Sequence, residues 1–152
     1  MSRDSKYAVG SSKDFAWTSF FLLCGFGLII CCSTRDPKFQ QYFVEGEQLY
    51  LKNCSNCHQK NGTGLGRVYP PLASSDFLDK NVDAVACLIK RGRSGLMTVN
   101  GVVYNQPMPG AVSLTELEIA EITTYIYNSW GHEKGLIDVR QISQSLQPCL
   151  SD

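Results

Sequence analysis

Residues 52–60 read KNCSNCHQK, in which Cys54 and Cys57 are three positions apart and His58 follows the second cysteine directly. The whole chain of 152 residues contains seven cysteines and only two histidines. With this composition, a C-x-x-C-H pattern is expected by chance on the order of 0.004 times in a chain of this length. The pattern therefore indicates a site that requires two thiols and one imidazole close together.

Attachment of a c-type haem explains this spacing. Two thiols three residues apart near the end of a helix can form thioethers with the two vinyl groups on one edge of a porphyrin, and the adjacent imidazole then lies under the iron. A zinc site requires four ligands, and no second C-x-x-C or H-x-x-x-H follows in the chain. A thioredoxin-like redox pair follows a strand, whereas residues 42–53 have helical periodicity. The motif predicts one haem c, bound covalently through Cys54 and Cys57 and ligated by His58.

A second axial ligand must then come from later in the chain, where Met97, Met108 and His132 are the candidates. Met97 precedes an Asn-Gly dipeptide between β-branched residues, which predicts a hairpin, so we expect Met97 to pack as a strand residue. His132 ends a helical segment, where we expect a surface position. Met108 lies between two prolines, which stiffen a loop that holds its thioether at a fixed distance from the iron. We predict that Met108 is the ligand, which favours electron transfer over catalysis.

Residues 15–32, FAWTSFFLLCGFGLIICC, contain no charged side chain. The run is close to the minimum that spans a bilayer core, and the basic residues before it predict that the start stays cytoplasmic while the rest is exported. Two interpretations stay open: an uncleaved anchor, or a lipoprotein signal in which Cys32, or else Cys31, carries the lipid. Both tether the chain to a bacterial cytoplasmic membrane with its haem domain on the periplasmic side.

Charge and cysteine content narrow the possible functions and the division of the chain into parts. Fourteen basic and fourteen acidic residues cancel, so no electrostatic footprint for a nucleic acid is present. A disulfide between Cys87 and Cys149 is compatible with an exported chain, but we expect Cys87 to be a small buried hydrophobic residue in a helix. We predict four parts, namely a signal or anchor (1–32), a linker (33–44), a haem domain (45–132) and a C-terminal extension (133–152).

Three more helical faces follow from the spacing of apolar residues. Residues 82–92 end with a glycine, as a helix does at its C-cap, and residues 113–131 begin with Ser113 and Glu116 spaced as a capping box. The extension is expected to form a helix that packs either on the domain itself, which we prefer, or on a partner subunit. The first of these faces carries Val82, Val85, Ala86 and Ile89, the second Ile119, Ile122, Ile126 and Trp130, and the third Leu136, Val139, Ile142 and Leu146.

Four blocks between about residues 45 and 132 resemble the class I c-type cytochromes. The resemblance implies an all-α fold of three to five helices around one haem, with a small β-hairpin before the methionine loop. It also implies that Gly46 and Tyr50 lie where the first helix crosses the last, and that a proline carbonyl, Pro70 in preference to Pro71, accepts the Nδ1 proton of His58. The blocks are GEQLYLKNCSNCHQKNGTG, YPPLASSDFL, LMTVNGVVYNQPMPG and LTELEIAEITTYIYNSWG.

The resemblance is greatest to mono-haem domains of membrane dehydrogenases, reductases and oxidases. The implied function is electron transfer in a bacterial respiratory chain without bond-making chemistry, between a quinol-oxidising complex, such as alternative complex III, and a terminal oxidase. If Met108 is not a ligand, the alternative is a haem-based sensor of small molecules or a weak peroxidase.

Overall fold

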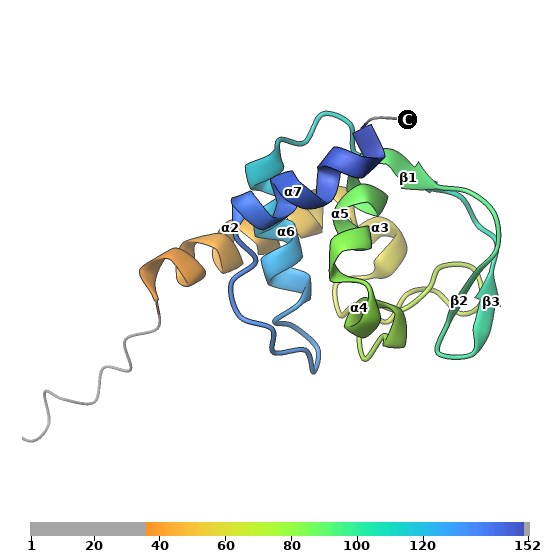
Figure 1. Ribbon diagram of the computed structural model, residues 1–152. Coiled ribbons are helices and arrows are strands. Elements are labelled where there is room, and N and C mark those ends of the chain that lie inside the picture. Colours follow the sequence, from red (N-terminus) through yellow and green to blue (C-terminus); the bar gives the residue numbers. More distant parts are fainter. Residues whose placement is uncertain (1–35, 151–152) are drawn as a thin grey trace, which may run out of the picture. The chain divides into compact units, whose positions relative to one another are not determined.

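The computed structural model describes residues 36–150, so the apolar segment 15–32 and the lipid candidates Cys31 and Cys32 lie outside the described residues. Between residues 36 and 150, no helix is long and apolar enough to cross a membrane. The mostly helical fold with a small hairpin is confirmed (Figure 1). Its helices are α2 (Pro37–Asn53), α3 (Ser55–His58), α4 (Asp76–Lys80), α5 (Val82–Arg91), α6 (Glu116–Ile126) and α7 (Val139–Leu150); its strands are β1 (Gly92–Arg93), β2 (Met97–Val99), β3 (Val102–Tyr104) and β4 (Met108–Pro109).

Helix α2 begins within the stretch that we expected to be a linker. Pro37 occupies the first helical position, and the side chain of Asp36 accepts a hydrogen bond of 3.0 Å from the backbone N–H of Lys38. Tyr42 is buried, so this part of the helix belongs to the domain. The linker prediction is therefore wrong from residue 37 onward, because it overlooked Asp-Pro as a helix start.

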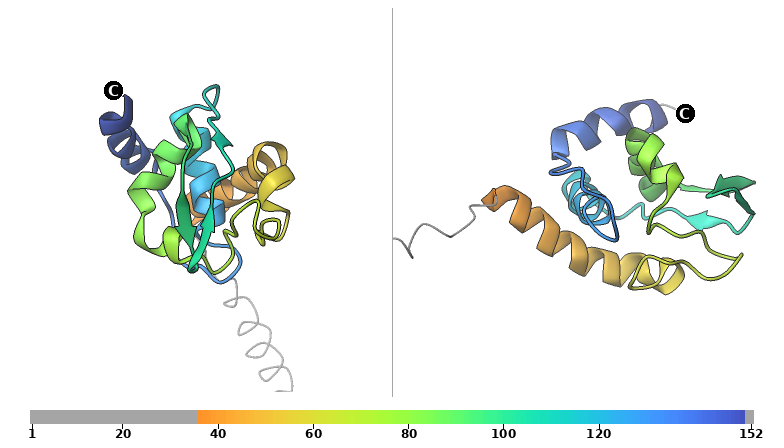
Figure 2. Two further views of the ribbon diagram at one scale, coloured as in Figure 1. Left: turned by 90° about the vertical axis from the view of Figure 1, so that its right-hand side faces the viewer. Right: turned by 90° about the horizontal axis from the view of Figure 1, so that it is seen from below.

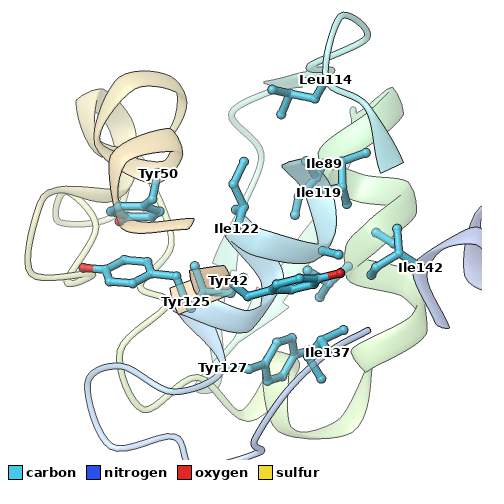
Figure 3. Packing of buried hydrophobic residues seen from close by; sticks show 14 of the residues in the cluster. Tyr42, Tyr50, Ile89, Leu114, Ile119, Ile122, Tyr125, Tyr127, Ile137 and Ile142 are labelled. Atoms are coloured by element: carbon cyan, nitrogen blue, oxygen red, sulfur yellow. The ribbon is translucent and has the colours of Figure 1, made fainter. Parts of the chain in front are cut away.

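Helices α2 and α6 cross at Gly46. A Cβ atom on Gly46 would lie 2.0 Å from the carbonyl oxygen of Glu121 and 2.9 Å from Cβ of Tyr125, so only glycine permits this approach. Tyr50, one turn later, is fully buried, and its ring centroid lies 5.4 Å from that of Tyr125 and 5.2 Å from that of Trp130. Figure 3 shows the Tyr50 and Tyr125 rings together in the core. The predicted crossing at Gly46 and Tyr50 is confirmed.

Helix α6 lies between α2 and α7 (Figure 2), and all eight residues from Ile119 to Ile126 are buried. Its capping box is formed by Thr115 and Glu118: the Thr115 hydroxyl accepts from the backbone N–H of Glu118 at 3.2 Å, and the Glu118 carboxylate accepts from that of Thr115 at 2.8 Å. The predicted box at Ser113 and Glu116 is wrong by two residues, because both pairs satisfy the same sequence pattern.

The C-terminal extension packs on the domain itself, as we preferred. Ile142 and Leu146 of α7 are buried against the domain core, with Leu136 and Val139 partly buried beside them. Helix α7 contacts α5 and α6, and a disulfide joins Cys87 of α5 to Cys149 of α7. The expectation that Cys87 is an unpaired hydrophobic residue is wrong. The chain turns back after α6, so that α7 packs against α5 and Cys149 lies next to Cys87.

The disulfide gives the first stability prediction. It closes a loop with a sequence separation of 62, so replacing Cys87 and Cys149 by serine is expected to lower the free energy of unfolding by about 4 kcal/mol. Urea unfolding monitored by far-UV circular dichroism measures this loss. Cys149→Ser alone should lose as much as the double variant, since either change removes the cross-link. A variant with an unchanged urea midpoint would show that the cross-link contributes nothing.

Candidate functional site

The C-x-x-C-H motif lies where α2 ends and α3 makes one further turn. The backbone N–H of His58 donates to the carbonyl of Cys54 at 3.0 Å, so Cys54, Cys57 and His58 are held within a single turn. All three side chains line one pocket. The free space in this pocket, counted together with the solvent at its mouth, is about 1020 Å³.

The pocket wall is built from nearly every element of the fold and is predominantly apolar. Among the described residues that line it, Arg93 is the one lysine, arginine, aspartate or glutamate. Such a wall suits a flat hydrophobic ring with a small number of polar anchors, which is the chemistry of a porphyrin. The aliphatic and aromatic part of the wall comprises Leu72, Phe77, Leu78, Val85, Leu88, Ile89, Val99, Tyr104, Ile122 and Ile126.

His58 is oriented by the segment that follows the motif. Its Nδ1 lies 3.0 Å from the carbonyl oxygen of Pro70. Because a carbonyl can only accept, Nδ1 carries the hydrogen and Nε2 retains its lone pair. Burial lowers the pKa of the His58 imidazole, and the bond to Pro70 opposes this only in part. The ring is therefore neutral at neutral pH, which is the form that binds a metal ion. This is the contact that the resemblance implied for Pro70.

The two motif cysteines are free thiols in this structure. Burial, with a smaller effect of Cys57, raises the pKa of the Cys54 thiol to about 11, so this thiol stays protonated at neutral pH. In the part of the chain from 36 to 150, no three His, Cys, Asp or Glu side chains come together to hold a metal ion. The pair is instead suited to the addition of each S–H across a vinyl group, which forms a thioether.

Met108 lines the same pocket from another part of the fold. We expected a loop, but Met108 begins the short strand β4, which pairs antiparallel with β1 in the register Arg93–Met108 and Gly92–Pro109. Gly92 has φ of +76°, and a Cβ there would lie 2.3 Å from the carbonyl oxygen of Met108. Because residue 92 is a glycine, β4 can lie directly against the chain at the end of α5.

The other two candidates for the second ligand have different surroundings. Met97 lies on β2 of the predicted hairpin, which is confirmed, and its side chain also lines the pocket. His132 is only 5% exposed, so the surface position expected for it is wrong. Its Nδ1 lies 3.1 Å from Oδ1 of Asp79 and its Nε2 lies 2.9 Å from the carbonyl oxygen of Leu72. Both nitrogens already face acceptors of the protein, and His132 does not line the pocket.

Comparison with known proteins gives the family. Residues 43–130 match the family model for cytochrome c. The chain belongs to the cytochrome c family. It is 32% identical over 95 residues to cytochrome c-552 of Thermus thermophilus, which covers 60% of this chain and 72% of that protein. A second cytochrome c-552 of Thermus thermophilus has the same identity over the same length, and 64% of that relative is covered.

A second group of relatives consists of subunits of larger enzymes. The cytochrome c subunit of alcohol dehydrogenase (quinone) from Gluconacetobacter polyoxogenes is 33% identical over 92 residues, which is 59% of this chain and 19% of that subunit. The chain therefore spans less than a fifth of the length of this relative. As a member of the family, the chain carries covalently bound haem c in a class I cytochrome c fold, and its function is electron transfer.

Proposed function

We propose that this protein is a mono-haem electron carrier in which Cys54 and Cys57 form the thioethers, and His58 and Met108 bind the iron. The observation that carries the proposal is that the three motif side chains and that of Met108, which comes from β4, line one apolar pocket. The motif occurs once in the chain, which supports a single haem. When bound, the haem supplies a reversible one-electron couple between ferric and ferrous iron.

The residues around the pocket adjust that couple. The carbonyl of Pro70 accepts from His58 Nδ1 and makes the imidazole a stronger electron donor, whereas a thioether from Met108 raises the reduction potential. The apolar wall surrounds the haem with a medium of low polarity, which is one of the factors that set its reduction potential. His58 and Met108 would hold the haem iron, and no coordination site would then be left for a substrate. Ligation by both residues would favour an electron carrier over a sensor or a peroxidase.

The proposed location is the periplasmic face of a bacterial cytoplasmic membrane. The uncharged run 15–32 supports a tether, either as an uncleaved anchor or as a lipoprotein signal that ends at Cys32 or Cys31. The disulfide between Cys87 and Cys149 supports the same location, because disulfides persist in oxidising compartments such as the periplasm. A tether keeps the haem domain near its membrane partners at high local concentration, so electron transfer does not require tight binding.

The proposed partners are a quinol-oxidising complex, such as alternative complex III, and a terminal oxidase. Support comes from relatives that are cytochrome subunits of a quinone-linked dehydrogenase, and from the tether proposed here. Co-purification in mild detergent with a haem-rich membrane complex is the result expected for a permanent subunit. Release as a monomer under the same conditions would contradict the subunit role.

Mass spectrometry of the intact mature chain, extracted from membranes, tests the number of haems and the tether together. The expected mass is that of the polypeptide plus one haem, with either acyl chains on a chain that begins at Cys32 or Cys31, or residues 15–32 still present. Two haem masses would contradict the mono-haem proposal. A mature chain that lacks both the acyl chains and residues 15–32 would contradict the tether.

A further inference from the structure

The two histidines of this chain hold the same short segment of backbone. His58 Nδ1 lies 3.0 Å from the carbonyl oxygen of Pro70, and His132 Nε2 lies 2.9 Å from the carbonyl oxygen of Leu72. His58 comes from the haem motif, whereas His132 comes from the far end of the domain, after α6. The carbonyl that orients His58 is therefore two residues away from a carbonyl fixed by His132.

The segment between these two carbonyls has few backbone N–H groups that could hold it in place. Pro70 and Pro71 have no backbone N–H, so the first amide available is that of Leu72, which donates to the carbonyl of Gly62 at 2.7 Å. The carbonyl of Leu72 accepts from His132 and, at 3.3 Å, from the backbone N–H of Ser75. On the other side of Pro70, Tyr69 is held by the backbone of Leu65, whose N–H donates to the Tyr69 carbonyl at 3.0 Å. The Pro70 carbonyl therefore lies between two fixed points, and Leu72 is the one that His132 contacts.

Two further contacts hold His132 in place. Its Nδ1 lies 3.1 Å from a carboxylate oxygen of Asp79 in α4, and its ring meets that of Tyr127 edge to face with 6.3 Å between centroids. The Tyr127 hydroxyl donates to the carbonyl of Leu78 at 2.8 Å, which connects the same group to α4 a second time. Because the Leu72 carbonyl can only accept, Nε2 of His132 carries a hydrogen and donates it. The imidazole thus links α4 to the segment behind His58.

We infer that His132 is a positioning residue for the axial ligand: through Leu72 it sets the place of the Pro70 carbonyl and so the strength of the Pro70–His58 hydrogen bond. The inference rests on the proposed role of His58 as iron ligand. A firmly held Nδ1–H makes the imidazole a stronger donor to iron and stabilises the ferric state. Loosening Leu72 weakens this bond and shifts the equilibrium toward ferrous iron.

The test compares holoprotein variants at position 132. His132→Phe keeps a ring of similar size but removes the donor, and His132→Gln keeps an N–H donor. At a fixed applied potential, His132→Phe is expected to raise the ferrous-to-ferric ratio by about threefold to tenfold, and His132→Gln should restore most of the natural value. Spectroelectrochemistry measures the ratio, and NMR of the ferrous protein measures hydrogen exchange at His58 Nδ1, which should be faster in His132→Phe only.

The exposed neighbour Glu133 provides the matched control, because Glu133→Gln alters charge at the adjacent position and should leave both readouts unchanged. An unchanged ratio and exchange rate in His132→Phe would overturn the inference, as would a Gln variant that behaves like the Phe variant. If His132→Phe does not accumulate, Asp79→Asn takes its place and should shift the ratio in the same direction by a smaller factor; no shift would overturn the inference.

These outcomes are separable from failure of the proposed function. A natural protein that lacks the spectrum of histidine and methionine ligation would contradict the proposed role of His58 and Met108. A natural protein with that spectrum, whose ferrous-to-ferric ratio does not respond at position 132, would leave the ligation in place and remove only the role of His132.

Discussion

Replacing Met108 with alanine is expected to abolish the sulfur-to-iron absorption band and to lower the reduction potential by at least about 60 mV, a tenfold change in the equilibrium between the two iron states. The reason is that a thioether stabilises ferrous iron more than water or hydroxide does. Truncation of the side chain also opens one side of the iron, so the ferrous variant should bind carbon monoxide, which the natural protein should not. Optical spectra of both redox states measure all three changes.

Met97→Ala is the matched control for this experiment. Met97 also lines the pocket, but it belongs to the β2–β3 hairpin and its expected role is packing. The Met97 variant should therefore keep the absorption band and the closed iron. If Met97→Ala loses the band while Met108→Ala keeps it, the ligand has been assigned to the wrong methionine. If the natural protein itself lacks the band, the sensor or peroxidase alternative gains support.

The second large effect concerns attachment of the cofactor. A chain with Cys54→Ser and Cys57→Ser is expected to retain almost no haem after export and purification. The reason is that both covalent links are lost, and the pocket is open at its mouth. Haem absorbance per mole of polypeptide measures the loss.

The double replacement of Cys87 and Cys149 by serine is the control for removing two cysteines. That pair forms the disulfide between α5 and α7 and lines no part of the haem pocket, so its variant should keep one haem per chain despite its lower stability. Full haem content in the Cys54/Cys57 variant would contradict attachment at the motif. Equal loss of haem in both variants would indicate that folding, rather than attachment, limits haem content.

The predictions that succeeded depend on short local patterns. The Asn-Gly dipeptide between β-branched residues correctly predicted the hairpin. The prediction is specific because few residues adopt positive φ at both central positions of such a turn. Apolar spacing indicated the buried faces of α5, α6 and α7, since a helix must bury one side of its surface. The expectation for Gly46 had a different source, because the family resemblance implied the helix crossing, where a side chain would collide with the backbone of Glu121.

The predictions that failed depend on contacts distant in the sequence. Nothing near His132 in the sequence shows that the turn after α6 brings it to Asp79 and Leu72, so the surface position was the natural expectation. The partner of Cys87 is likewise determined by how α7 returns along α5. The start of α2 was missed for a different reason. Asp36 and Pro37 are a local signal for a helix start, but the prediction used only the spacing of apolar residues.

Extraction of the natural, mature protein with acidified acetone tests the central claim most directly, when it is followed by mass spectrometry of its proteolytic peptides. We predict that the pigment stays with the precipitated polypeptide, and that the peptide containing Cys54, Cys57 and His58 is heavier than its sequence by the mass of one haem. A pigment that dissolves in the acetone, or a haem mass on a different peptide, would contradict covalent attachment at this motif.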